Sequence, residues 1–292
     1  MNDAMGPVVV GWDASPEAHL ALQRGHERAE RTQCPLRVVI ALGDIGKLSV
    51  WADEWTRGLG EEWSAKAQKV LAELGRPELV PELVEGTPTD VLIAASRTAS
   101  IVVVGAGGHG PLFGRLLGSV SQQLARHAAC PLLVVRAGGV AVGPVVVGVD
   151  GSPGSMAALE FALAEGAARR LPVDALYVPQ HLPGYVYWEG PAPVELLRDL
   201  EAHDAQVRAT VEAALAGHPD LVAQVRIAEG SAAHEIARAS ENASLVVVGS
   251  RGTTGSSRLL LGSVANAVLH RSHCPVAIIH APVEEEGSQP CD

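Results

Sequence analysis

One glycine pattern occurs twice in this sequence, and its repetition constrains the fold more than any other feature. Residues 105–119 and residues 249–263 both read Gly-x2-Gly-x9-Gly-Ser. Each copy follows a run of valines and leads into a segment of helical period. A strand, a glycine-rich loop and a helix N-terminus in this order present free backbone amides to a phosphate group. The sequence therefore predicts two equivalent units, each with one candidate phosphate site.

Other landmarks repeat as well. Residues 8–16 match residues 145–153 at an offset of 137, whereas the glycine pattern and the Cys-Pro pairs at Cys130 and Cys274 repeat at an offset of 144. The difference between the two offsets means that the second unit carries seven additional residues. We place this extra length in the segment 179–193.

The chain has 292 residues, which is more than one domain usually contains. The segment that joins the two units, 137–144, is short and made of small, partly apolar residues, so we expect the units to pack closely together. The predicted domains are 1–138 (unit one) and 144–284 (unit two), followed by a flexible tail, 285–292.

Each unit alternates apolar runs with segments of helical period. Several runs are continuous in valine, isoleucine or leucine, as is typical of parallel strands buried on both faces. The pattern predicts an α/β fold with a parallel sheet and right-handed crossovers. The expected strands are 7–11, 36–42, 79–84, 101–105 and 132–136 in unit one, and 144–149, 172–178, 222–227, 245–249 and 276–280 in unit two. The expected helices of unit one are 16–31, 61–74, 88–98 and 118–128.

The first helix of each unit has a clear start signal. Ser15-Pro16 and Ser152-Pro153 fit a serine N-cap followed by proline in the first turn. The segment 16–31 is also amphipathic. Its apolar side holds Ala18, Leu22 and Ala29, and its polar side holds Glu27, Arg28, Glu30 and Arg31.

The two units diverge most in the segments 43–60 and 179–200. These segments hold most of the few aromatic residues: Trp51, Trp55, Tyr185, Tyr187 and Trp188. Two interpretations stay open, namely ordinary packing of a long loop and helix over the domain, or a surface for a protein partner, where exposed aromatic residues are favoured.

Charge and cysteine usage exclude several classes of protein. The net charge is −11 with no basic stripe, which argues against a nucleic-acid partner. None of the four cysteines has C-x-x-C spacing, so the sequence indicates neither a zinc site nor a thioredoxin-type site. We expect Cys130 and Cys274 to be small buried residues.

The apolar runs have only 4–8 residues, so the sequence predicts no membrane span. The N-terminus lacks the basic and apolar regions of a signal peptide, and we therefore expect a cytoplasmic protein.

A short acidic motif follows the first strand of each unit, Gly11-x-Asp13 and Gly148-x-Asp150. In doubly wound sheets, ligands bind beyond the carboxyl ends of the strands where the strand order reverses. If the first and fourth strands are neighbours, each aspartate faces the glycine-rich loop. The aspartates could instead be turn acids, and the serines after the loops could be plain N-caps. Because acid and loop recur at matching intervals, we favour a nucleotide site.

The glycines of these loops allow a backbone to approach a ligand closely, or to adopt a positive φ where one is required. The amides at the start of the following helix carry a partial positive charge of roughly half an electron. A Rossmann dinucleotide site is disfavoured, because the loops follow the fourth strand and not the first. The faint P-loop likeness of residues 43–49 fails, because leucine follows its lysine.

These motifs resemble the universal stress protein family, specifically its tandem two-domain bacterial members that bind ATP. The resemblance covers nearly the whole chain and includes the Val-Gly-x-Asp-x-Ser-Pro start and the Cys-Pro before the last strand. It implies a five-stranded parallel sheet in the order 3-2-1-4-5 in each unit and pairing of the units through their last strands. It also implies ATP as ligand, or AMP or ADP, with Mg²⁺ alongside the phosphates.

Carried over by motif, the aspartates lie toward the ribose, the loops wrap the phosphates, and Ala41 and Val178 are adenine contacts. In unit one the implied site residues are Gly11, Asp13, Ala41, Gly105, Ala106, Gly107, Gly108, His109, Gly118, Ser119 and Val120. In unit two they are Gly148, Asp150, Val178, Gly249, Ser250, Arg251, Gly252, Gly262, Ser263 and Val264.

The two loops differ in one respect. Unit two keeps the Ser250-Arg251 pair that is usual in the family, whereas unit one has Ala106-Gly107. A charge-assisted hydrogen bond contributes about 1.5–3 kcal/mol, so the second site should bind more tightly unless His109 or Arg115 compensates. Arg251 could instead be a solvated loop residue.

The favoured function is an ATP-binding stress or regulatory protein with an unidentified protein partner. Each site offers one recurrent acid, Asp13 or Asp150, and no lysine follows the loops, so we expect weak ATP hydrolysis at most. Two alternatives remain, an adenylyl- or phosphoryl-transfer enzyme of related fold and a nucleotide-free interaction scaffold. Further homodimerisation also remains open.

Overall fold

The structure is a computed structural model that describes residues 6–43, 50–108, 117–138, 140–179, 194–252 and 261–280, and for residues 50–56 only the backbone. In unit one the elements are β1 (Val8–Gly11), α1 (Pro16–Thr32), β2 (Leu36–Ala41), α2 (Val50–Glu73), β3 (Glu82–Val84), α3 (Pro88–Ser96), β4 (Ile101–Gly105), α4 (Ser119–His127) and β5 (Leu132–Val135). In unit two they are β6 (Val145–Val149), α5 (Pro153–Arg169), β7 (Val173–Tyr177), α6 (Val194–Ala216), β8 (Ala223–Ile227), α7 (Ala232–Ala239), β9 (Leu245–Gly249), α8 (Ser263–Arg271) and β10 (Val276–Ile279).

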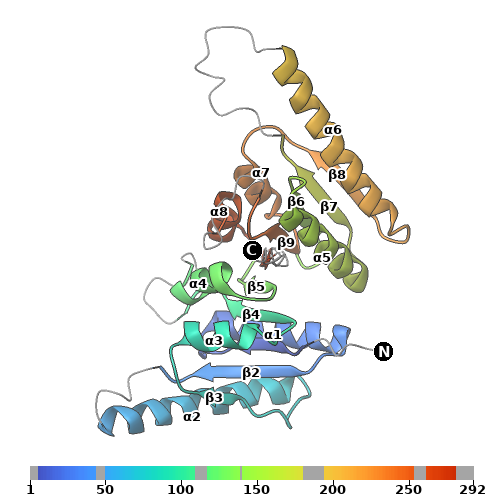
Figure 1. Ribbon diagram of the computed structural model, residues 1–292. Helices are drawn as coiled ribbons and strands as arrows, with labels where there is room; N and C mark the ends of the chain where they lie inside the picture. Colours follow the sequence, from blue (N-terminus) through green and yellow to red (C-terminus); the bar gives the residue numbers. More distant parts are fainter. Residues whose placement is uncertain are drawn as a thin grey trace, which may run out of the picture.

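The strands of the described residues form one continuous sheet in the order β3-β2-β1-β4-β5-β10-β9-β6-β7-β8 (Figure 1). Within each unit the order is 3-2-1-4-5 and all pairs are parallel. The units join where β5 and β10 pair antiparallel, with Leu133 opposite Ala277. The order, the parallel pairing and the contact through the last strands are therefore confirmed.

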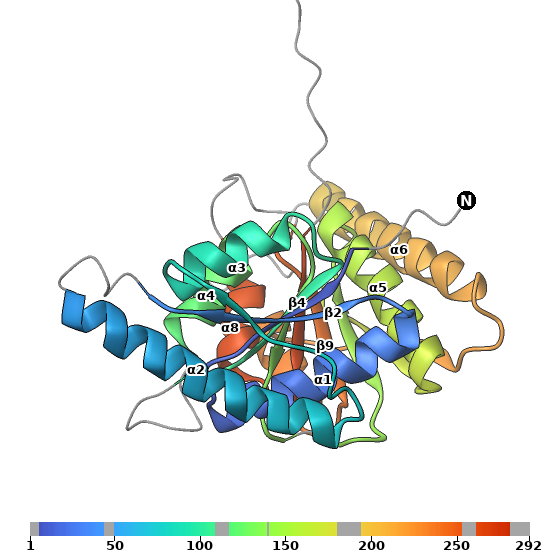
Figure 2. The same ribbon diagram turned by 90° about the horizontal axis from the view of Figure 1, so that it is seen from below.

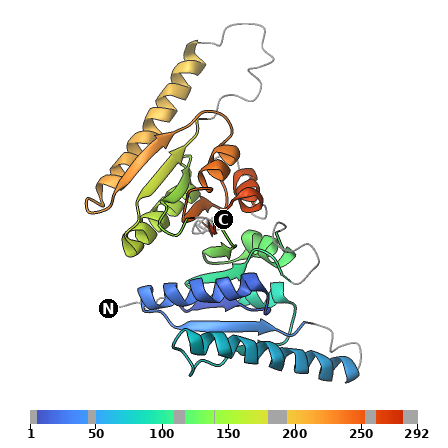
Figure 3. The same ribbon diagram turned by 180° about the vertical axis from the view of Figure 1, so that it is seen from behind.

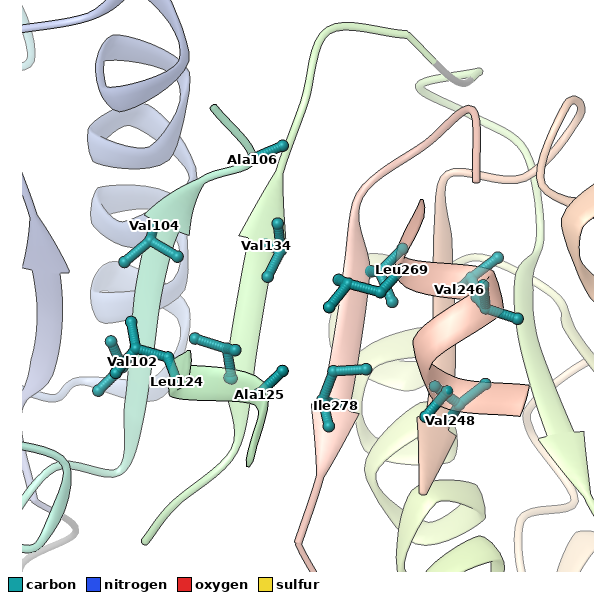
Figure 4. Close-up of a cluster of buried hydrophobic side chains, with 14 of the residues drawn as sticks. Val102, Val104, Ala106, Leu124, Ala125, Val134, Val246, Val248, Leu269 and Ile278 are labelled. Carbon is teal, nitrogen blue, oxygen red and sulfur yellow. The ribbon is translucent and has the colours of Figure 1, made fainter. Parts of the chain in front are cut away.

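Helices cover both faces of this twisted sheet. In Figure 2 the strands of unit one run between α1 and α2 below and α3 and α4 above. One hydrophobic cluster includes side chains of α3, α4, α7 and α8 and spans both units, as Figure 4 shows on the two sides of the β5–β10 seam. The opposite face has a separate cluster in each unit, under α1 and α2 and under α5 and α6. The two units thus share a core as well as a sheet. Figure 3 shows the two units from behind, with unit one below unit two.

The start signals of α1 and α5 are confirmed. Ser15 accepts a hydrogen bond from the amide of Ala18 at 3.1 Å, and Ser152 accepts one from the amide of Ser155 at 3.2 Å. In each case the first turn contains the predicted proline. These caps fix the start of each helix directly after the acidic motif. They thereby hold the aspartate in place beside the sheet.

Helix α2 begins at Val50 and not near residue 61 as predicted. Gly58 and Gly60 precede the predicted start, and glycine is unfavourable inside a helix. The helix continues through them. A Cβ at position 60 would lie 2.3 Å from a methyl carbon of Leu42, so the missing side chain lets α2 lie close to the end of β2.

The additional residues of unit two fall where the sequence predicts them. Eight residues separate β2 from α2, whereas sixteen separate β7 from α6. Residues 180–193 lie outside the described residues, and so do the side chains of Trp51 and Trp55.

Two further expectations concern burial. Cys130 and Cys274 are buried, as predicted. Arg28, placed on the polar side of α1, has a side chain only 15% exposed, because it meets Glu165 of α5. Among the described residues, no helix combines the length and the apolar character that a membrane span requires.

Candidate functional site

Each unit places its acidic motif and its glycine-rich loop at the same edge of the sheet. Strands β1 and β4 are neighbours, as are β6 and β9, so their carboxyl ends lie side by side in each unit; we call this place the crevice of the unit. A Cβ on Gly108 would lie 3.1 Å from Oδ2 of Asp13, and a Cβ on Gly252 would lie 2.5 Å from Oδ2 of Asp150. The carboxylate and the loop therefore face one another in both units, as the sequence predicts.

The two oxygens of each aspartate have different surroundings. Oδ1 of Asp13 accepts a hydrogen bond from the amide of Ser15 at 3.0 Å. Oδ1 of Asp150 accepts bonds from the amide and the hydroxyl of Ser152, at 3.0 and 2.6 Å. The turn-acid interpretation is thus correct for Oδ1, while Oδ2 lies next to the loop glycine. Each aspartate therefore fixes the turn with one oxygen and places the other beside the loop.

The helices α4 and α8 begin at this crevice. Their N-caps are Gly118 and Gly262, and no side chain caps either helix. Ser119 and Ser263 are the first helical residues and are exposed, so neither serine is an N-cap. The first amides of a helix have no partner within it, and both helix ends are therefore suited to an anionic oxygen.

Packing between backbone segments explains several of the predicted glycines. A Cβ on Gly105 would lie 2.7 Å from Cβ of Glu17 at the start of α1, and one on Gly249 would lie 2.7 Å from the backbone of Gly154 at the start of α5. Gly11 and Gly148 lie against side chains of α3 and α7 in the same way. None of the four loop glycines, at positions 105, 108, 249 and 252, has a left-handed φ.

The middle of each loop is attached to the last strand of its unit. The amide of Ala106 donates to the carbonyl of Val135, and the amide of Ser250 donates to that of Ile279, both at 2.7 Å. Ala106 and Ser250 are buried, while Gly107 and Arg251 are half-buried.

Unit one adds a side-chain contact at this point. The hydroxyl of Ser121 donates to the carbonyls of Gly105 and Ala106, at 2.9 and 3.2 Å. Position 265, which is equivalent in unit two, is alanine. The two loops therefore differ in their supporting contacts as well as in their sequence.

The remaining implied site residues lie nearer the core. Val178 is only 7% exposed, which leaves little of its surface for a base. Ala41, Val120 and Val264 are partly buried and pack against the cluster that spans the two units. His109, together with Arg115, lies outside the described residues.

Helices α4 and α8 each end on a side chain of the opposite unit. Arg136, directly after β5, donates to the carbonyls of Leu269 and Ser272 at the end of α8, at 2.6 and 2.8 Å. His280, directly after β10, has its ring nitrogens 3.2 Å from the carbonyl oxygens of Ala125 and Cys130. The contacts are related by the repeat offset and link the site of each unit to the other unit.

Arg251 acts on this second contact. Burial lowers the pKa of His280, and the charge of Arg251 lowers it further, while the two carbonyls partly oppose the shift. Arg251 itself is half-buried.

Sequence reasoning missed Glu17, Arg136 and His280. Oε2 of Glu17 is buried beside the loop of unit one without a hydrogen-bond partner. Arg136 and His280 follow the last strands at equivalent positions of the repeat. This recurrence is the sequence signal that could have identified them. Among the described residues, no group of three or more histidine, cysteine, aspartate or glutamate side chains is placed to hold a metal.

The fold and the two crevices define a tandem protein of doubly wound α/β domains with a loop-and-helix site in each. The model of the Universal stress protein family matches residues 5–136 and 142–280. The chain therefore belongs to the universal stress protein family.

Similar proteins support this assignment over the whole chain. Universal stress proteins Rv2005c and Rv2623 of Mycobacterium tuberculosis H37Rv are 32% and 30% identical to it, over 93% and 95% of this chain and 96% and 97% of their own length. The crystal structure of a universal stress protein from Archaeoglobus fulgidus DSM 4304 matches with a TM-score of 0.66 at 20% identity, covering 94% of this chain and 96% of that one. At 20% identity, the structural match shows the fold alone.

Proposed function

We propose that this protein binds an adenine nucleotide, ATP in the first instance, in the crevices beside Asp13 and Asp150. One observation carries the proposal. In both units a carboxylate oxygen faces a loop glycine that leads to a helix end without a side-chain cap. The amides hold the phosphates, and the carboxylate accepts hydrogen bonds from the ribose hydroxyls. AMP and ADP fit the same description with fewer phosphates.

The nucleotide acts as a regulatory ligand in this proposal. Each crevice holds one recurrent acid, and hydrolysis also needs a base and groups that hold the metal. Mg²⁺ would be held mainly by the phosphates. The protein would therefore hydrolyse ATP slowly at most, and its bound nucleotide would set its conformation or its choice of partner in a stress response. We also propose a cytoplasmic location, an unidentified protein partner and the domain bounds 1–138 and 144–284.

The first test is direct. The protein is purified without added nucleotide and denatured, and the released small molecules are identified and counted by mass spectrometry. Adenine nucleotide at one or two equivalents supports the proposal. An empty protein that shows no binding of ATP, ADP or AMP by calorimetry would favour the scaffold alternative. Steady ATP turnover abolished by Asp150→Ala would favour the enzyme alternative.

A glycine substitution tests the geometry of the site. Gly252→Ala places a methyl group about 2.5 Å from Oδ2 of Asp150, so the carboxylate or the loop must shift and ATP should bind more weakly in unit two. Gly58→Ala is the matched control, because a Cβ there has no atom within 4 Å. Equal affinity in the two variants, measured by calorimetry, would argue against the crevice as the site.

The difference between the loops predicts unequal sites. If Arg251 meets a phosphate, unit two binds ATP more tightly, and Arg251→Ala weakens that site by roughly tenfold to a hundredfold. Calorimetry that finds two equal sites, or an unchanged affinity in the variant, would contradict this part of the proposal without affecting the rest.

A further inference from the structure

A second charged cavity lies between α1 and α5, at the junction of the two units. Its lining includes four arginines, Arg24, Arg28, Arg31 and Arg169, and two glutamates, Glu27 and Glu165. The pocket therefore carries a surplus of two positive charges in a chain whose net charge is −11. Such a local excess of positive charge attracts anions.

The glutamates do not neutralise all of the arginines. Glu165 is shared by Arg28 and Arg31, the latter at 3.3 Å. Arg28 also lies over the ring of Phe161, with Cζ 4.8 Å from the ring centre, which fixes its guanidinium plane. Glu165 is therefore already paired with two arginines of unit one.

Arg169 is the unmatched charge. In the described part of the chain it forms no hydrogen bond or ion pair with the protein. Burial lowers its pKa, and the nearby charges of Arg24 and Arg31 lower it further, against the opposing effect of Glu165 and Glu27. A half-buried guanidinium held beside two others is stabilised when an anion enters among them.

The size of the cavity limits which chemical groups can enter it. Its volume is about 30 Å³, and it is partly open to solvent. The cavity cannot enclose a base or a sugar. It admits a compact group such as the oxygens of one phosphate, with the remainder of any larger molecule outside.

We infer that this cavity is a phosphate-binding site, separate from the nucleotide crevices, in which Arg169 of unit two and Arg24 and Arg31 of unit one hold one phosphate group between the units. Planar guanidinium groups match the oxygens of phosphate better than a point charge does. Arg169 ends α5, whereas Asp150 precedes its start, and 17 residues of helix put about 24 Å between them. A phosphate here therefore reinforces the contact between the units without competing for the crevices.

The test measures binding of inorganic phosphate by calorimetry, and the melting temperature, at constant ionic strength in a buffer without other phosphate. Arg169→Gln should weaken phosphate binding about tenfold or more, and should leave the melting temperature without phosphate unchanged or higher, because it removes a repelled charge. If Arg169 had a purely structural role, Arg169→Gln would lower the melting temperature instead. Arg198→Gln, which removes an exposed arginine of α6, is the matched control and should behave as the unmodified protein does.

Glu165→Gln should change the affinity for phosphate in the opposite direction. It removes a negative charge from the cavity, so phosphate should bind more tightly and raise the melting temperature by more than in the unmodified protein. Glycerol 3-phosphate, titrated in the same way, tells whether free or esterified phosphate is preferred at the site. The inference is overturned if phosphate does not bind, or if Arg169→Gln and Arg198→Gln bind it equally, which would place phosphate in the glycine loops.

Discussion

At the scale of single residues, the two units form the same turn with different amino acids at the position after the aspartate. The residue after each aspartate has a positive φ, +61° at Ala14 and +79° at Gly151. Only glycine adopts this region without a steric penalty. Unit two therefore forms its acidic turn without strain, while unit one keeps a methyl group that packs partly against its core.

Gly151→Ala should lower the free energy of unfolding by about 1–2 kcal/mol, since a left-handed conformation costs that much for residues with a Cβ. The new Cβ would also lie 2.8 Å from a methyl carbon of Val207. Chemical denaturation measures the change. Ala14→Gly gives the comparison: relief of strain is offset by a lost methyl contact, so its effect should stay within about 0.5 kcal/mol. Equal losses in both variants would show that φ is not the deciding factor.

At the scale of elements, helices α4 and α8 run from a candidate phosphate site to a contact with the other unit. The contact at the end of α8 is made by Arg136, which stays charged, and the one at the end of α4 by His280, which titrates. The links between the units therefore respond differently to pH. Protonating His280 places a charge in a buried position and near Arg251.

His280 should make the protein less stable in acid. Its folded-state pKa lies below the ordinary value, so the unfolded chain binds more protons at low pH and the stabilisation present above about pH 6.5 is lost as pH falls. The free energy of unfolding, measured by denaturation between pH 7.5 and 5, should fall less steeply in His280→Gln. His203→Gln, at an exposed position on α6, should keep the original slope. A steeper slope in His280→Gln would mean that the imidazole is stabilised in its charged form.

Much of this element structure could be predicted, and the exceptions have physical causes. The strands and α1 follow from periodicity and caps, and the crevices follow from motifs that recur at fixed intervals. The start of α2 was missed because Gly60 serves a contact with Leu42 that lies outside the helix. The burial of Arg28 was missed because its partner lies on the other unit, and one helix's periodicity carries no information about a partner elsewhere in the chain.

At the scale of the whole molecule, a continuous sheet, a shared hydrophobic cluster and an ion pair join the units. The pair between Arg28 and Glu165 is nearly buried, with side chains 15% and 10% exposed. Breaking a buried pair by changing one partner leaves a charge uncompensated. The contact between α1 and α5 should therefore be sensitive to the sign of the charges on both helices.

Charge reversal tests this contact. Arg28→Glu alone should destabilise the protein by about 3 kcal/mol, because two carboxylates then meet, and Glu165→Arg alone should place one more arginine in an already positive cavity. The double variant should recover part of the loss in a double-mutant cycle of unfolding free energies. A double variant that loses the sum of the two single effects would show that the residues do not interact.

Positions 28 and 165 are the same position of the repeat, since they lie 137 residues apart. Near the axis that relates two identical domains, such a position would meet its own copy, arginine against arginine or glutamate against glutamate. Placing both domains on one chain allowed the two copies to take opposite charges. At this position a first unit is repelled by another first unit and attracted to a second unit, so pairing between like units of different chains is disfavoured.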